Sequence, residues 1–162
     1  MRYDPYCPDN SVTPAACRPT WTVPAGRTKT KRSHVVHLTP QMMALLPDRE
    51  AGQPLVFPSP WGKSFQGFSS MKKALDKASG VGGWVLHDLR RTVVSGMAAL
   101  GVAPHVADKI LNHQSGAISG IAAVYQRHEF MAERKAATEL WSDHVDGILR
   151  AVRDEERTRG AP

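Results

Sequence analysis

The sequence predicts a mostly α-helical domain with a small antiparallel β-sheet near the N-terminus. Two β-prone runs, 21–23 and 34–38, flank a polar and basic stretch early in the chain. Later stretches instead repeat apolar residues at helical spacing. With 162 residues, 41% of them hydrophobic and 22% charged, the chain has the size and composition of one globular domain.

The chain divides by composition into a lead-in over residues 1–20, a domain over 21–150 and a charged tail over 151–162. The lead-in is proline-rich and lacks periodicity, so it is expected to be irregular. The tail is expected to fray. No apolar run approaches the ~18 residues that a membrane helix needs, and Met1 to Pro24 has no apolar signal-peptide core. We therefore expect a cytoplasmic protein without a membrane partner.

The first elements are predicted from turn and capping chemistry. The runs 21–23 and 34–38 form a hairpin whose tip is basic. Thr39 and Pro40 fit the N-cap and first position of a short helix that ends near Leu46. Residues 55–57 are predicted to be a short strand that Pro58 stops.

Residues 69–79 are predicted to be a helix that ends at Gly80. Apolar residues recur there at i, i+3, i+4 and i+7, which predicts one buried face. That face comprises Met71, Ala74, Leu75 and Ala78. Lysines lie off this stripe, at Lys72, Lys73 and Lys77.

The later helices are predicted over 86–100, from Pro104 to about Asn112, and from Glu129 to Arg150. Gly101 ends the first of them. Its core-facing residues are predicted to be Leu89, Val93 and Met97. The face of the last helix comprises Ala137, Trp141, Val145 and Ile148.

The net charge points to a polyanionic partner. Lys and Arg outnumber Asp and Glu by 21 to 15, a formal net charge of +6. Cations that neutralise phosphates release counterions and give sequence-independent affinity for nucleic acid. A basic soluble protein without such a partner fits the charge equally well.

The first candidate functional residues are His87 and Arg90. They lie three residues apart at a predicted helix start, so they face the same way. A guanidinium, an imidazole and a helix N-terminus together suit a phosphate. The alternative is that His87 caps the helix and Arg90 is solvated. His113, which ends the next helix, is either a catalytic group or a C-terminal cap. Tyr125 is either a nucleophile or a half-buried core residue.

The order of these residues resembles a known family. The string HDLRRT…LNH…VYQRHEF resembles the catalytic signature of tyrosine recombinases, the phage-integrase family, and especially of prophage-type integrases. WTVPAGRTKTKRSHVVHLTP resembles their β-hairpin, and ERKAATELWSDHV resembles their C-terminal helix. The resemblance covers roughly Trp21 to Leu149.

The resemblance implies a site-specific DNA breaking and rejoining reaction, as in integration or excision. Tyr125 would attack the scissile phosphate and form a 3′-phosphotyrosine bond. Arg90 and His113 would bind the phosphate, and His87 would assist proton movement at the tyrosine. Lys29, with Lys31 as a close competitor, would protonate the departing 5′-oxygen. The covalent intermediate conserves the phosphodiester energy, so no cofactor or metal is expected.

The sequence departs from the family at its start. The family's first arginine lies in a Thr-Gly-x-Arg-like turn upstream of the hairpin, and neither Arg2 nor Arg18 has the flanking Gly and Glu. The family's arm-type and core-binding domains are expected to be missing as well. We therefore expect a catalytic domain that is truncated on its N-terminal side and cleaves DNA very poorly.

Two other functions fit parts of the sequence. Residues 86–112 also fit a helix-turn-helix, as in a non-catalytic DNA-binding or regulatory module. The last helix, with Trp141 and Val145 on one stripe, could instead dock on a neighbouring copy and form a homo-oligomer, or serve as a core helix.

The sequence predicts weak, salt-sensitive binding to double-stranded DNA. The contacting cations are expected to be Arg27, Lys29, Lys31, Arg32, Lys72, Lys73 and Arg91. Each one removed from a phosphate contact should lower the slope of log affinity against log salt by roughly 0.9. Fluorescence anisotropy with a labelled duplex across a salt series measures this slope. An affinity that stays constant between low and moderate salt would contradict the prediction.

Overall fold

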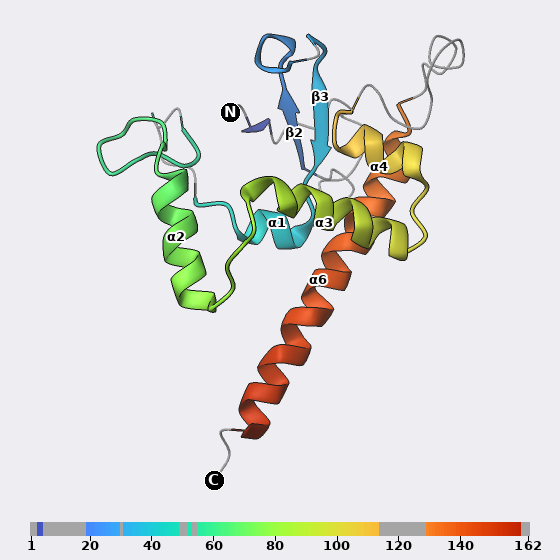
Figure 1. Cartoon of the computed structure of the whole chain (residues 1–162). Coiled ribbons are helices and arrows are strands. Elements are labelled where there is room, and N and C mark those ends of the chain that lie inside the picture. The colour runs from blue at the N-terminus through green and yellow to red at the C-terminus, as the bar shows by residue number, and fades with distance from the viewer. Residues whose placement is uncertain are drawn as a thin grey trace.

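The computed structural model describes the backbone of Tyr3–Asp4 and residues 19–29, 31–48, 52, 55–113 and 129–159. Its elements are mostly helices, with one small antiparallel sheet near the start of the chain (Figure 1). No helix within the described ranges is both long and apolar enough to cross a membrane.

The sheet contains three strands in the order β1-β2-β3. They are β1 (Tyr3–Asp4), β2 (Thr20–Val23) and β3 (His34–His37). β2 and β3 form the predicted hairpin, with Trp21 opposite Val36. A short 3-10 helix, η2 (Ala25–Arg27), begins the tip. The buried Thr28 hydroxyl donates to the carbonyl oxygen of Arg32 over 2.7 Å, which holds the two sides of the tip together.

Helix α1 (Pro40–Ala44) confirms the predicted capping chemistry. The Thr39 hydroxyl accepts a hydrogen bond from the Met42 amide at 3.3 Å, as expected of an N-cap. The same hydroxyl lies 3.0 Å from the Ser142 hydroxyl, and both residues are buried. The cap therefore also fixes the chain after β3 to the last helix.

The remaining helices are α2 (Phe68–Ser79), α3 (Leu86–Ala99), α4 (Pro104–Ile110) and α6 (Met131–Arg159). The predicted ends at Gly80 and Gly101 are confirmed, with φ of 69° and 81°. This left-handed backbone is accessible to glycine at little cost.

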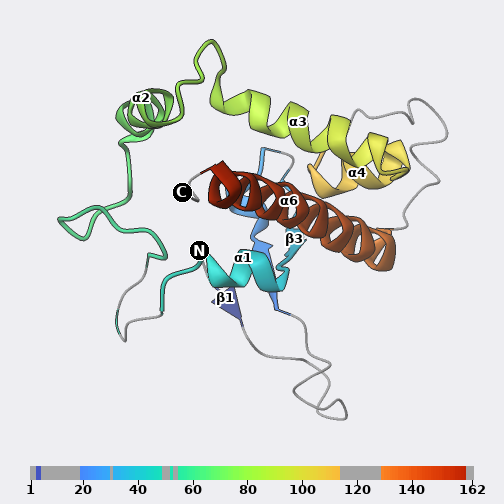
Figure 2. The same ribbon diagram turned by 90° about the horizontal axis from the view of Figure 1, so that it is seen from below.

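The core lies where α6 crosses α3, α4 and β3. Its buried apolar side chains are Leu38, Met97, Val106, Ala107 and Ala137. Seen from below, α4 lies between α3 and α6 at one end (Figure 2), and Figure 1 shows α6 crossing α3 at an angle. The second half of α6 extends beyond the other elements (Figure 1).

The predicted strand at Leu55–Phe57 is wrong. This stretch forms no strand, and nearby only an isolated antiparallel bridge joins Pro58 to Ser64. A strand needs a neighbour to satisfy its backbone groups, and among the described residues none lies alongside. The last helix also differs, because it continues as regular helix to Arg159 instead of ending near Arg150 and fraying.

The predicted buried face of α2 is exposed. Met71 and Leu75 are 43% and 47% exposed, and Ala74 and Ala78 are exposed too. α2 stands apart from the other helices (Figures 1 and 2). One of its half-buried residues is Lys72, whose ammonium lies 4.4 Å from the centre of the Trp84 ring. Periodicity identifies an apolar face but does not determine what covers it.

In α3 the predicted core face is correct only in its second half. Leu89 is 55% exposed, whereas Val93 is half-buried and Met97 is buried. Gly96, in this second half, lies against Trp141 of α6, and Figure 1 shows α6 crossing α3 near the same end. The start of α3 lies away from this crossing, so its apolar stripe is not buried there.

The packing of α3 on α6 depends on Gly96. A Cβ atom added there would lie 2.1 Å from Cζ3 of Trp141. Gly96→Ala should therefore lower the free energy of unfolding by about 1–3 kcal/mol, because overpacking forces a shift of the helices. Gly147→Ala is the matched control, since nothing lies within 4 Å of its added Cβ. It should raise stability by roughly 0.5–1 kcal/mol through helix propensity. Urea unfolding measures both, and equal effects of the two substitutions would contradict this packing.

Candidate functional site

The C-terminal end of α4 is held by two side chains from other elements. The His34 Nε2 atom of β3 lies 3.1 Å from the Ile110 carbonyl oxygen. The Arg90 Nη2 atom of α3 donates to the next carbonyl, that of Leu111. Helix ends leave such carbonyls without intrahelical partners, and a cation there also interacts favourably with the helix dipole. β3, α3 and α4 therefore meet at one junction.

His113 follows this junction directly. The chain turns at Asn112, which has a left-handed φ of 55°. The His113 amide then donates to the Asp108 carbonyl at 2.9 Å, and its exposed ring places Nδ1 3.3 Å from the Asp108 carboxylate. The predicted residues Arg90 and His113 thus both lie at the end of α4. The bonds to Asp108 also fit the alternative in which His113 caps the helix.

Arg90 is half-buried and not fully satisfied. Its Nε is buried and has no hydrogen-bond partner among the described residues. The alternative of a solvated Arg90 is therefore wrong. A guanidinium that retains a donor in a partly desolvated place is suited to an anionic oxygen, because charge-assisted hydrogen bonds are the stronger ones.

The start of α3 is capped by Asp88 and not by His87. The Asp88 carboxylate accepts from the Val85 amide at 2.8 Å. This bond, with a smaller effect of Arg91, lowers the pKa of Asp88. His87 is exposed in the first turn, and Arg91 forms a 2.8 Å ion pair with Asp88.

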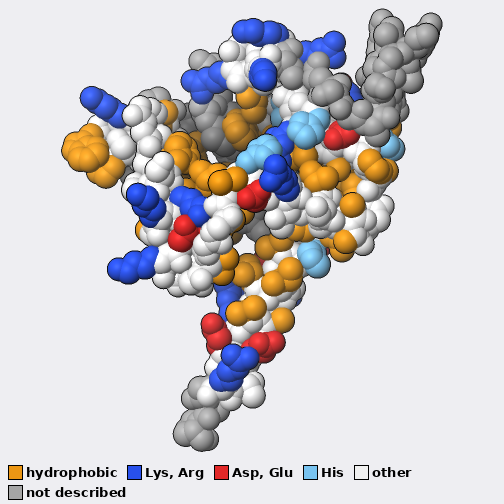
Figure 3. All heavy atoms as spheres, viewed as in Figure 1, with side chains coloured by type: hydrophobic (Ala, Val, Ile, Leu, Met, Phe, Trp, Pro, Cys, Tyr) orange, Lys and Arg blue, Asp and Glu red, His pale blue; other side chains and the backbone are white. Residues whose placement is uncertain are grey.

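The cations predicted to bind DNA are mostly exposed. Those of the hairpin tip are Arg27, Lys29, Lys31 and Arg32, all exposed. Figure 3 shows Lys and Arg side chains over the hairpin, and histidine with Lys or Arg between the sheet and α3. Lys73 is exposed, whereas Lys72 is half-buried and 2.6 Å from Asp76. Whether Lys29 acts on a leaving group remains a prediction.

Tyr125 lies outside the described residues, as do Arg2 and Arg18. The structure describes both flanks of the segment 114–128, which contains Tyr125. One flank ends at His113, and the other begins at Glu129. No group of three potential His, Cys, Asp or Glu ligands for a metal occurs in the described parts of the chain.

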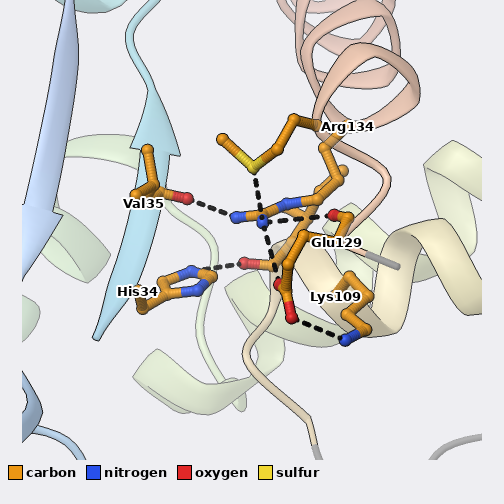
Figure 4. A network of polar contacts seen from close by, with 7 residues as sticks. His34, Val35, Lys109, Glu129 and Arg134 are labelled. Atoms are coloured by element: carbon orange, nitrogen blue, oxygen red, sulfur yellow. Dashed lines mark hydrogen bonds and ion pairs between the residues drawn. The ribbon is translucent and has the colours of Figure 1, made fainter. Parts of the chain in front are cut away.

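A polar network centred on the buried Arg134 side chain joins the flank that begins at Glu129 to β3 and α4 (Figure 4). The Arg134 side chain, only 3% exposed as a residue, donates to the Val35 carbonyl of β3. It also lies 3.8 Å from the Glu129 carboxylate. That carboxylate in turn forms a 3.2 Å ion pair with Lys109 of α4.

The sequence pattern did not predict this network. The available signal was an arginine on an apolar stripe, since Arg134 lies three residues before Ala137 and seven before Trp141. A charge at such a position indicates a buried ionic group that needs partners.

Two histidines near this network are less basic than usual. Burial, and then the positive charge of Arg134, lower the pKa of His34. The same two causes lower the pKa of His37. His34 is therefore neutral at neutral pH, and its contact with Ile110 assigns the proton to Nε2.

Comparison with known proteins finds a distant similarity to an integrase. The chain is 28% identical over 129 residues to the prophage integrase IntA of Escherichia coli (strain K12). The matched part covers 77% of this chain and 31% of the relative, so the chain spans about a third of the relative's length. No protein-family model matches the chain. No solved structure matches it either.

The lowered pKa values predict acid-sensitive stability. Below the ordinary histidine pKa of 6.5, the unfolded chain binds protons that folded His34 and His37 do not. The free energy of unfolding should therefore fall as pH decreases from about 7.5 to about 5. The double variant His34→Gln/His37→Gln should lose less stability over this range. Urea unfolding at a series of pH values measures the difference, and an equal loss in both proteins would refute the assignment.

Proposed function

We propose that this chain is the catalytic part of a tyrosine recombinase that breaks and rejoins DNA strands. The observation that carries the proposal is the junction at the end of α4, where the Arg90 guanidinium bonds to the backbone close to His113 in the sequence. The Arg90 guanidinium bonds to Leu111, two residues before His113, and within the described ranges its buried Nε has no partner. The distant similarity to a prophage integrase supports the same reaction class.

In the proposed reaction, the Tyr125 phenolate attacks the scissile phosphorus and the bond to the 5′-oxygen breaks. A 3′-phosphotyrosine forms, and the 5′-oxygen takes a proton from Lys29 or Lys31. A phenol with an ordinary pKa near 10 needs help to react at neutral pH, which His87 would give by accepting its proton. Arg90 and His113 would stabilise the negative charge that develops on the non-bridging oxygens.

A free 5′-hydroxyl reverses the same step and rejoins the strand. The phosphodiester energy is retained in the phosphotyrosine bond, so no nucleotide cofactor is needed. We assign this chemistry to residues 21–150. The exposed cations of the hairpin tip would bind the duplex backbone.

The helix-turn-helix alternative fits the structure less well. α3 and α4 do form two helices joined by a short turn. However, every residue of α4 after Pro104 is buried or half-buried, and α4 packs on α6. A recognition helix must instead present its side chains to a groove.

Self-association through α6 is a second part of the proposal. Trp141 and Val145 are half-buried, whereas Ile148 further along the same stripe is 51% exposed. The second half of α6 extends from the body (Figure 1), so its apolar stripe is accessible to another copy.

The proposal predicts a covalent protein–DNA adduct at Tyr125. The chain should be incubated with nicked duplexes that tile the DNA around its own gene, since the nick traps the intermediate. Denaturing gels then detect the adduct, and mass spectrometry of the digested adduct locates the phosphotyrosine. Arg90→Ala should slow its formation by about 10²–10³, the usual cost of losing one transition-state donor. We expect slow formation even in the unchanged chain.

Tyr125→Phe is the control that separates chemistry from binding. It should bind the same duplexes with unchanged affinity and form no adduct. An adduct that persists in Tyr125→Phe, or no adduct with any duplex despite binding, would exclude the proposed function.

A further inference from the structure

A short turn before α2 presents a tryptophan to solvent. The Ser59 amide donates to the Lys63 carbonyl at 2.6 Å, and the Lys63 amide donates to the Ser59 hydroxyl at 3.2 Å. The Gly62 amide donates to the Ser59 carbonyl at 2.9 Å, and its φ of 71° is the left-handed conformation that such three-residue loops need. Trp61 therefore lies at the tip of a turn whose two sides are hydrogen-bonded to each other.

The Trp61 side chain is the most prominent of several exposed aromatic groups in this part of the chain. Trp61 is 83% exposed, so it forgoes the large hydrophobic gain that burial gives an indole. Phe65 and Phe68 follow it, 38% and 53% exposed, with ring centres 5.1 Å apart in an edge-to-face arrangement. Exposed aromatic residues thus recur from the turn to the start of α2, at the side of the molecule (Figure 1).

The same stretch is positively charged. Residues 51–75 contain three lysines and neither Asp nor Glu. Lys63, which closes the turn, and Lys73 are exposed, whereas Lys72 is paired with Asp76. Figure 3 shows Lys or Arg side chains beside hydrophobic ones on the lobe around α2. A polyanion is therefore the kind of partner whose charge complements this surface.

We propose that the Ser59–Lys63 turn binds single-stranded DNA, with the Trp61 indole stacked on an unpaired base and the Lys63 ammonium on a neighbouring phosphate. An aromatic ring stacks on any base, because every base has a π-face, and nearby cations hold the sugar–phosphate backbone. The bases of a duplex are already stacked on one another, so a duplex offers this turn only phosphates. The binding does not depend on strand cleavage and goes beyond the proposed function.

The shape of the tip favours a base over a broad apolar partner. Trp61 is flanked by Pro60 and Gly62, both exposed, and then by Lys63. The tip therefore offers one flat ring beside one charge, which matches one nucleotide. A stable protein–protein interface needs a much wider contact, and a helix that lies in a membrane surface inserts a whole apolar face.

The first test compares two labelled oligonucleotides that carry the same number of phosphates. One is a short oligothymidylate, and the other is an abasic strand of the same length. Fluorescence anisotropy measures the binding of each to the full chain. The oligothymidylate should bind about tenfold more tightly, which lies within the range for one aromatic–base stack. Equal affinities for the two strands would overturn the proposal.

Substitutions separate the base contact from the phosphate contact. Trp61→Ala should weaken binding of the oligothymidylate by about tenfold and leave the affinity for the abasic strand unchanged. Trp61→Phe keeps an aromatic ring and should retain most of the preference. Lys63→Ala should instead weaken both strands, and lower the slope of log affinity against log salt by roughly 0.7. The matched control, Leu45→Ala, removes a side chain that is 79% exposed outside the turn, and should change neither affinity.

A spectroscopic readout reports on the stack itself. The difference in emission between the unchanged chain and Trp61→Phe isolates the fluorescence of Trp61. The oligothymidylate should quench this fluorescence, and the abasic strand should not. Because Trp61 is mostly exposed, Trp61→Ala should leave the midpoint of urea unfolding unchanged. Emission that is not quenched at saturating oligothymidylate would exclude stacking at this residue.

Cosedimentation with phosphatidylglycerol vesicles tests the competing partner, an anionic lipid surface. If the chain binds vesicles through Trp61 and binds the two strands equally, the turn contacts membranes and the proposal is wrong. None of these measurements requires an adduct at Tyr125. The stacking site and the recombinase function therefore stand or fail separately.

Discussion

The buried guanidinium of Arg134 is the constraint on which the junction depends. An arginine remains protonated in a protein interior, and an unpaired buried charge is strongly destabilising. Its partners, the Val35 carbonyl and Glu129, come from β3 and from the entry to α6. The first turn of α6 can therefore occupy only a place where both partners are in reach. Since α6 also packs on α3 and α4, the contacts of this one guanidinium link the sheet to the helices.

The same constraint gives the junction its electrostatic character. Arg134 and burial keep His34 neutral, so the imidazole can lie near two guanidinium groups without adding a third positive charge. Arg90 donates to the end of α4 through one nitrogen, and its Nε has no partner that the structure describes. A partly desolvated guanidinium that still has an N–H group to donate attracts an anion more strongly than solvated surface lysines do. This difference distinguishes the junction from the exposed hairpin tip, which suits weaker backbone contacts.

Local chemistry made much of the fold predictable. Thr39 with Pro40, and the glycines at 80 and 101, define helix ends through backbone preferences that act within a few residues. The errors concern non-local partners. Residues 55–57 have strand-like composition but no strand beside them, and Met71 and Leu75 form an apolar face that no described element covers. For the site, the sequence motif gave the order of Arg90 and His113. The contacts of Arg134 and His34 join distant parts of the chain, and the spacing of residues does not predict such contacts.

The Nε–H resonance of Arg90 in nuclear magnetic resonance spectra reports most directly on the central claim that the junction binds a DNA phosphate. Its buried nitrogen has no hydrogen-bond partner in the part of the chain that the structure describes, so a bound phosphate oxygen should produce a large shift. A short duplex should shift this resonance and the His113 ring resonances with the same dependence on DNA concentration, and added salt should reverse both. Shifts confined to the hairpin tip, with Arg90 and His113 unchanged at saturating duplex, would contradict the account.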